Sequence, residues 1–300
     1  MDLFSLRLFC DVVDTGSFTR AAERSGVTQP AVTQRLRALE QLCGTVLLER
    51  GRGKGRVYPT ESGRTLYEGA RQLVKQADDL EARMRQNSTG PAGVLRVATV
   101  YSVGLHGLPG KLKPFLAAHP GIKVLLEYSR TNKVYTDVLS GAVDVGIVAC
   151  PAMRPGIEVL PFTRDPMVVI CAPENPLARH REIELRDLLG QPMVAFADDI
   201  PTRKLTDERL QAAGVDLRIA TAVDNVETIK NLVEIGTGIA IVPENTVRHQ
   251  VREGTLVALV ISGPDRFTRP AGLLLRKARA ERAALRAFVD AMWDTSMETG

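Results

Sequence analysis

Apolar residues recur at helical spacing in the segment that follows Thr28. Val32, Leu36, Leu39 and Cys43 are separated by four, three and four residues, so they share one face of a helix. The pattern predicts an amphipathic helix with one buried and one exposed face, in which Thr28 caps the start and a proline is tolerated in the first turn. The exposed face carries Pro30, Gln34, Arg37 and Gln41, with Thr33 on its flank and Gln29 at its start.

A shorter helix is expected directly before this one. Ser17 has a hydroxyl that can accept an unpaired backbone N–H, and the helix would run to about Arg24. Gly26 suits the left-handed residue at which a helix ends. Two short helices joined by a tight turn predict a helix-turn-helix, whose second helix enters the major groove of DNA.

A third helical pattern extends from Thr60 to about Gln86 without proline. Its apolar positions alternate steps of four and three, which is the period of a coiled coil: Leu66, Ala70, Leu73, Ala77, Leu80 and Met84. A helix of roughly 26 residues spans about 39 Å, too long to bury this seam within a domain of about 60 residues. We therefore expect a dimerisation helix, although the seam could instead pack on the chain's own body. Residues 87–93 are typical of a hinge.

Beyond the hinge, short apolar runs alternate with amphipathic segments. This βαβα order predicts a mostly parallel sheet with helices on both faces, folded as two lobes. Strands are expected at 95–100, 123–128, 143–148, 167–172, 193–196, 239–242, 256–261 and 271–275, and helices at 105–118, 133–140, 185–189, 202–213, 226–235 and 280–292. We expect a DNA-binding domain at 1–60, a linker helix and hinge at 61–90, and an α/β domain at 91–300, with lobe I at 91–163 plus 268–300 and lobe II at 164–267.

A run of basic residues follows the helix-turn-helix. Four bases alternate with three glycines between Leu47 and Tyr58, and no acid interrupts them: Arg50, Arg52, Lys54 and Arg56. Glycines allow a tight reversal, and the bases predict phosphate contacts that weaken as salt rises. Residues 1–60 hold nine basic and six acidic residues, whereas residues 91–300 hold 25 and 24. The basic excess therefore lies with the helix-turn-helix, as DNA binding requires.

Composition excludes several classes of protein. The sequence has no run of about 18 apolar residues, so we expect no transmembrane helix. The N-terminus does not show the basic segment followed by an apolar segment that is typical of a signal peptide. The four cysteines form no CxxC pair, which favours small buried residues in a reducing compartment: Cys10, Cys43, Cys150 and Cys171. The four histidines have no metal-ligand spacing. We expect a cytoplasmic protein with no metal and no cofactor.

The exposed face of the second helix supplies the candidate DNA-reading residues. Gln pairs with adenine and Arg with guanine in the major groove, so amide, hydroxyl and guanidinium groups on one face suit base edges. The predicted DNA-binding residues are Gln29, Pro30, Thr33, Gln34 and Arg37 on the helix, with Arg50, Arg52 and Lys54 on the wing.

Polar segments follow several predicted strands of the α/β domain. In such sheets a ligand binds beyond the carboxyl ends of the strands, where hydroxyls and helix N-termini favour a small anion or carboxylate. The predicted effector-binding residues are Tyr101, Ser102, Ser129, Thr131, Phe196 and Thr202. Arg130, Lys133 and Arg203 would add positive charge.

In this order, the motifs resemble those of the LysR-type transcriptional regulators over nearly the whole chain. The resemblance rests on residues 6–22, 28–40 (T-Q-P-A-V-T-Q-R-L-R-A-L-E), 60–63, 141–147, 172–178 and 233–243 (V-E-I-G-T-G-I-A-I-V-P). It implies a winged helix, a linker helix and a two-lobed domain like periplasmic binding proteins. It also implies dimers that pair into tetramers, DNA contact by Gln29, Pro30, Thr33, Gln34 and Arg37, with Arg50 and Arg52 on phosphate, and effector contact by Ser102, Thr131 and Phe196. Leu48 and Cys43 replace the family's usual Phe and Leu at core positions, and the hairpin from Arg50 to Thr60 is about two residues longer than the common form.

The leading hypothesis is a DNA-binding transcriptional regulator, not an enzyme, that responds to a small-molecule effector. Its expected partners are double-stranded DNA, that effector and further copies of itself as a homodimer or homotetramer, with RNA polymerase as another candidate and no membrane. One alternative is an enzyme acting on a small acid, but no nucleophile elbow, phosphate loop or acid/base pair is present. The other is a solute-binding protein, which would leave the helix-turn-helix unexplained. The identity of the effector stays open.

Overall fold

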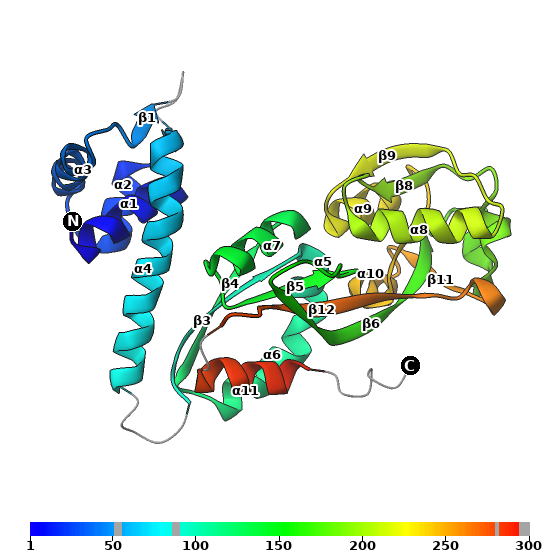
Figure 1. The fold of residues 1–300 in the computed structure, drawn as a ribbon. Helices are drawn as coiled ribbons and strands as arrows, with labels where there is room; N and C mark the ends of the chain where they lie inside the picture. The colour runs from blue at the N-terminus through cyan, green and yellow to red at the C-terminus, as the bar shows by residue number, and fades with distance from the viewer. Residues whose placement is uncertain (51–55, 86–90, 280–281, 294–300) are drawn as a thin grey trace. The chain divides into compact units, whose positions relative to one another are not determined.

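The computed structural model describes residues 1–50, 56–85, 91–279 and 282–293. They form two compact units, one that runs through the N-terminal helices to the end of the long helix α4 and a larger one that begins at strand β3 (Figure 1). Where the structure describes the chain, no helix is long and apolar enough to cross a membrane.

The N-terminal unit is a helix-turn-helix with a hairpin, as predicted. It contains α1 (Leu3–Thr15), α2 (Phe18–Ser25), α3 (Gln29–Cys43), β1 (Leu48–Arg50), β2 (Val57–Pro59) and α4 (Glu61–Arg85). Ser17 caps α2 by accepting the backbone N–H of Arg20 at 3.4 Å, and Gly26 ends it with φ of 66°. The two strands pair antiparallel, Glu49 opposite Tyr58.

Two local predictions for α3 are wrong. Thr28 occupies the N-cap position, but its side chain makes no capping hydrogen bond. Cys43 is exposed although it continues the apolar spacing, because it is the last residue of α3 and lies beyond the core that covers Val32, Leu36 and Leu39.

The apolar seam of α4 is partly buried within its own unit. Ala70 of the seam belongs to the core and Leu66 packs against it, together with Val74, which lies outside the seam. Leu73, by contrast, is 49% exposed, so part of the seam stays open to solvent. The side chains of Leu80 and Met84 lie outside the described residues, and dimerisation through α4 remains a prediction.

The larger unit has two lobes joined by long strands (Figure 1). The first lobe contains β3 (Gly93–Thr99), α5 (Tyr101–His106), α6 (Leu108–Ala118), β4 (Ile122–Tyr128), α7 (Thr131–Ser140), β5 (Val145–Ala149) and α11 (Ala283–Met292). The second contains β7 (Glu182–Ile183), β8 (Met193–Phe196), α8 (Pro201–Ala212), β9 (Ile219–Val223), α9 (Val226–Glu234), β10 (Ala240–Pro243), α10 (Arg248–Glu253) and β11 (Val257–Ile261), with 3-10 helices at Pro176–Arg179, Leu185–Leu188, Glu244–Thr246 and Gly263–Asp265. The chain leaves the first lobe on β6 (Ile157–Cys171) and returns on β12 (Thr268–Arg276). The predicted residue limits of the lobes remain a prediction.

The prediction of a mostly parallel sheet is wrong, because the main sheet is mixed. Its order is β4-β3-β5-β12-β6-β11-β7, and β10 also pairs with β6. β3 runs parallel to β4 and β5, but β12 is antiparallel to β5 and β6, and β6 is antiparallel to β10 and β11. The outgoing and returning strands between the lobes run in opposite directions, and this reversal mixes the sheet.

Helices cover both faces of the sheet, as expected. In the first lobe, α6 and α11 share a core with one face, where the rings of Phe115 and Phe288 meet edge to face at 5.2 Å. Val134 and Tyr135 of α7 pack in the core on the other face. In the second lobe, α8 and α9 likewise belong to separate cores.

Several predicted boundaries differ for identifiable reasons. The helix expected at 105–118 is two helices, because Leu108 and Pro109 start a new one after Gly107. The strand expected at 167–172 begins at Ile157, and the prolines within it at 161 and 166 hid its first part. Strands β7 and β9 and helix α10 were not predicted.

Candidate functional site

Helix α3 presents a polar face to solvent. Gln29, Pro30, Gln34 and Arg37 are exposed, and Thr33 is half-buried. The Gln29 amide donates to the Thr33 hydroxyl at 3.1 Å, and that hydroxyl donates to the Gln29 carbonyl at 3.1 Å. The Gln34 amide and the Arg37 guanidinium are exposed, and such groups are suited to hydrogen bonds with base edges.

The rest of the unit holds α3 in place. Glu40, on α3, accepts the backbone N–H groups of Leu47 and Leu48 at 2.9 and 3.3 Å, which fixes the end of the helix to the start of the hairpin. Asp11, on α1, pairs with Arg24 at 3.2 Å and accepts from Ser25 at 2.8 Å, which fixes α1 to α2. The exposed face of α3 is thus carried on a rigid support.

The predicted phosphate contacts fall on the hairpin that follows α3. Arg52 and Lys54, and the side chain of Arg50, lie outside the described residues. At the base of the hairpin, Arg56 lies over the ring of Tyr58, with 5.6 Å from guanidinium carbon to ring centroid, and is exposed.

A cavity of about 200 Å³ lies between the two lobes. All six predicted effector-binding residues line it, together with residues that the prediction did not include. Its lining comes from the ends of five strands: Val100, Tyr101 and Ser102 after β3, Ser129, Arg130 and Thr131 after β4, Ala149 of β5, Phe196, Ile200, Pro201 and Thr202 after β8, and Asp224, Asn225 and Val226 after β9. The strand ends meet there as the sequence predicted, which makes this cavity the candidate effector site.

The lining mixes apolar and hydroxyl-bearing side chains with one arginine, one aspartate and one asparagine. Ser102, Phe196 and Thr202 are buried, whereas Tyr101 is 44% exposed and stacks on Tyr128 with ring centroids 5.1 Å apart. A small molecule with an apolar body and a few polar atoms fits such walls.

The three basic residues expected to add charge are already paired. Lys133 lies 2.6 Å from Asp137. Arg203 lies 2.9 Å from Asp198 and 2.8 Å from Asp207. None of them brings an uncompensated charge to the cavity, and the expectation of added charge is corrected accordingly.

Arg130 reaches from the first lobe to two carboxylates of the second. It pairs with Asp199 at 3.2 Å and with Asp224 at shorter range. The hydrogen bond to Asp224, and then the two negative charges, raise the pKa of the guanidinium. Arg130 and Asp224 both line the cavity, so an anionic ligand there must compete with Asp224 for Arg130.

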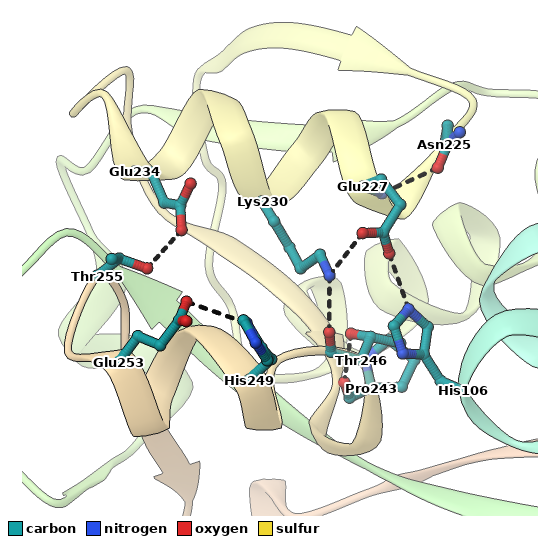
Figure 2. A network of polar contacts seen from close by, with 10 residues as sticks. All are labelled: His106, Asn225, Glu227, Lys230, Glu234, Pro243, Thr246, His249, Glu253 and Thr255. Carbon is teal, nitrogen blue, oxygen red and sulfur yellow. Dashed lines mark hydrogen bonds and ion pairs between the residues drawn. The ribbon is translucent and has the colours of Figure 1, made fainter.

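A second polar link joins the lobes (Figure 2). His106, at the end of α5, lies 2.7 Å through Nε2 from Oε1 of Glu227 on α9. The other carboxylate oxygen of Glu227 lies 2.8 Å from the ammonium group of Lys230, which also donates to the Thr246 carbonyl at 2.9 Å. Burial opposes ionisation of Glu227, but the hydrogen bonds from Lys230 and His106 outweigh it, and its pKa is lowered.

Sequence reasoning missed the residues that strand β9 contributes. Asp224, Asn225 and Val226 reach the cavity because β9 pairs parallel with β8 and ends beside it. The available signal was Asn225, whose side chain caps α9 by accepting the Glu227 N–H at 2.9 Å. Within the described ranges, no group of His, Cys, Asp and Glu residues is placed to hold a metal ion.

A helix-turn-helix unit and a two-lobed unit with a cavity between its lobes together define the class of DNA-binding regulators that respond to a ligand. Comparison with known families agrees: residues 3–64 match the bacterial regulatory helix-turn-helix protein family lysR, and residues 88–296 match the LysR substrate binding domain. The chain belongs to the LysR family, as its motifs suggested.

Individual relatives are similar over most of their length. The HTH-type transcriptional regulator CbbR of Cereibacter sphaeroides is 30% identical over 265 residues, which cover 87% of this chain and 84% of that protein. The RuBisCO operon transcriptional regulator of Allochromatium vinosum is 29% identical over 289 residues, with 96% and 94% covered. These relatives are named as transcriptional regulators, not enzymes.

Solved structures share the fold. Full-length CbnR complexed with its target DNA superposes with a TM-score of 0.76 at 26% identity, covering 97% of this chain and 99% of that one. The effector binding domain of QuiR in complex with shikimate gives 0.61 at 24% identity, covering 67% and 96%, which is a likeness of fold.

Proposed function

We propose that this protein binds specific promoter DNA through α3 and the wing, and that a small effector in the interlobe cavity changes that binding. One observation carries the proposal: a single chain joins an exposed polar helix face on a helix-turn-helix to a cavity lined by five strand ends. The complex of CbnR with its target DNA supports the DNA-binding part.

The contacts with DNA divide into two kinds. Gln29, Pro30, Thr33, Gln34 and Arg37 would contact bases, whereas Arg50, Arg52 and Lys54 would contact phosphates. The chain would act as a homodimer or homotetramer through α4, so that two α3 helices reach two half-sites of a pseudo-palindrome. The proposed domain limits are 1–60, 61–90 and 91–300.

The proposed effector is a small anion or carboxylate. Hydroxyl-bearing Ser102, Ser129 and Thr131 line the cavity, and Arg130 in its wall becomes available to an anion that displaces Asp224. An effector can change DNA binding only if it binds one arrangement of the lobes better than the other. The contacts of Arg130 with Asp199 and Asp224, and of His106 with Glu227, join the two lobes. A change in the arrangement of the lobes would alter these contacts.

DNA binding is tested with the purified full-length chain and the DNA upstream of its own coding region. We expect binding that prefers this DNA to a shuffled sequence of equal length and that weakens as salt rises. Equal affinity for both sequences, or no salt-sensitive binding, would contradict the DNA-binding part of the proposal.

The effector is sought with a thermal-shift screen of small acids on the same full-length chain. A ligand that binds only the folded state raises the melting temperature as its concentration rises above Kd. We expect a hit that also changes the footprint on the upstream DNA. A hit that leaves DNA binding unchanged at saturation would contradict its role as an effector.

A further inference from the structure

Arg269 is a buried guanidinium at the point where the chain returns to the first lobe. It is 0% exposed and lies directly opposite Asp165 in the pairing of β12 with β6. Its Nη2 donates to Oδ2 of Asp165 at 2.8 Å, and the other carboxylate oxygen accepts from the Asn245 amide at 3.1 Å. A buried charge persists only when it is paired in this way.

The second end of the guanidinium reaches the effector cavity through Ser102. Nη1 of Arg269 donates to the Ser102 hydroxyl oxygen at 2.9 Å. A serine hydroxyl has a single hydrogen to donate, and this contact uses the oxygen as an acceptor, so the hydrogen must point elsewhere. Ser102 lines the cavity, and none of the described residues accepts that hydrogen.

We propose that Arg269 is a positioning residue that fixes Ser102 as a hydrogen-bond donor toward the cavity, and so selects effectors that offer an acceptor oxygen there. This inference rests on the proposed function and gives a structural reason for its effector class: a ligand with an acceptor oxygen, such as a carboxylate, should bind better than an amine. A hydroxyl that accepts from a charged donor is polarised and donates more strongly, which favours a charged acceptor further. The charge of Arg269 itself is balanced by Asp165, so selection works through the orientation of the hydroxyl.

The first test compares matched ligands on the full-length chain. Propionate, succinate and benzoate are each measured beside the corresponding amide and amine, by thermal shift at millimolar concentration and then by calorimetry. We expect at least one acid to bind about tenfold more tightly than its amine, the size of a charge-assisted hydrogen bond. An amine that binds as tightly as its acid, or a set in which no acid binds, would overturn the inference.

The second test asks whether Arg269 acts through Ser102. Ser102→Ala, the paired change Arg269→Gln with Asp165→Asn, and the triple variant form a double-mutant cycle for the acid found above. Ser102→Ala and the paired change should each weaken binding about tenfold, and the triple variant should be no weaker than either. If the loss of affinity in the triple variant equalled the product of the two separate losses, Arg269 would not act through Ser102. The paired change removes both charges, so no unpaired charge remains in the core.

A milder variant covers the case in which the paired change does not fold. Arg269→Lys keeps the positive charge beside Asp165 but loses the planar fork whose two separate nitrogens reach Asp165 and Ser102, so the preference for acid over amine should fall. Retention of the full preference in this variant would overturn the inference. Arg266→Gln, an exposed arginine just before β12, is the matched control and should change nothing.

The outcomes separate this inference from the proposed function. Intact DNA binding and a bound ligand, without coupling between Arg269 and Ser102, would refute the inference alone. Loss of sequence-specific DNA binding by the wild-type chain would refute the proposed function.

Discussion

His106 on helix α5 and Glu227 on helix α9 join the two lobes that enclose the interlobe cavity. The contact is 2.7 Å long, between the end of α5 and the first turn of α9 (Figure 2). The N-terminus of α5 supplies Ser102 to the cavity wall, and the residue before α9, Asn225, lines the opposite wall. The pair therefore holds together the two helices between which the ligand would bind.

The pKa of Glu227 predicts how this contact responds to acid. Its pKa is lowered from the ordinary value of 4.5, so the folded state favours the carboxylate. The resulting stabilisation is present above pH 4.5 and is lost as the pH falls through the lower folded-state pKa. Glu227→Gln should therefore destabilise the chain near neutral pH and make little difference in strong acid. Urea unfolding of both proteins across this range measures the effect, and a difference that does not change with pH would refute it.

Arg37 is expected to discriminate between bases. Arg37→Ala should relax the preference at one operator position by about 1–3 kcal/mol, because a guanidinium can make two hydrogen bonds to guanine. Competition binding against operators with single base changes measures this loss.

Arg35 is the matched control on the same helix. It lies over the ring of Phe4 at 4.9 Å and near Asp2 at 3.7 Å, and its side chain leaves α3 in another direction. Arg35→Ala should leave base preference intact. Equal loss of preference in both variants would show that Arg37 does not read a base.

The sequence was sufficient to predict helices whose signals come from residues close together in the chain. The spacing of Val32, Leu36 and Leu39 predicted α3, and the hydroxyl of Ser17 predicted the start of α2. Both depend on neighbours within a few residues, so no tertiary information was needed. The positions of polar residues after strands likewise predicted six residues of the cavity wall.

Features that depend on pairing between distant segments were not predictable in the same way. Arg269 and Asp165 meet only because β12 pairs with β6 in one register, and neither residue stands in a motif. Strand β9 was missed because none of its five residues is buried and its sequence carries a weak apolar signal, and Asp224 was missed with it. Cys43 followed the helical spacing, but whether a core reaches the last turn of a helix depends on the neighbouring elements.

Asp224 is expected to oppose the binding of an anion. It pairs with Arg130 in the cavity wall, so a carboxylate ligand must displace it before it can use the guanidinium. Asp224→Asn should raise the affinity for succinate several-fold, since removal of one carboxylate leaves Arg130 more available. Arg130→Gln should lower that affinity, and calorimetry on the full-length chain measures both. A neutral amide ligand is the control and should respond little. An unchanged affinity for succinate in Asp224→Asn would show that Arg130 takes no part in binding.

Gly63 and Gly69 lie in the same helix, α4, but in different surroundings. A Cβ added to Gly63 would lie 2.0 Å from the backbone oxygen of Leu47, which a rigid hairpin base cannot move away. A Cβ added to Gly69 would meet nothing within 4 Å. Alanine is favoured over glycine in a helix interior by about 1 kcal/mol, so Gly69→Ala should stabilise the N-terminal unit by up to that amount. Gly63→Ala should destabilise it by about 1–3 kcal/mol, because overpacking outweighs the helical preference.

Urea unfolding followed by circular dichroism at a fixed protein concentration compares the two glycine variants. The close approach of Gly63 to Leu47 sets the angle at which α4 leaves the hairpin, so Gly63→Ala should also weaken binding to the upstream DNA. Gly69→Ala controls for any general effect of alanine on α4. If both variants were stabilised equally, the clash at Gly63 would be absent in solution, and the hairpin would not be held against the start of α4 as the structure shows.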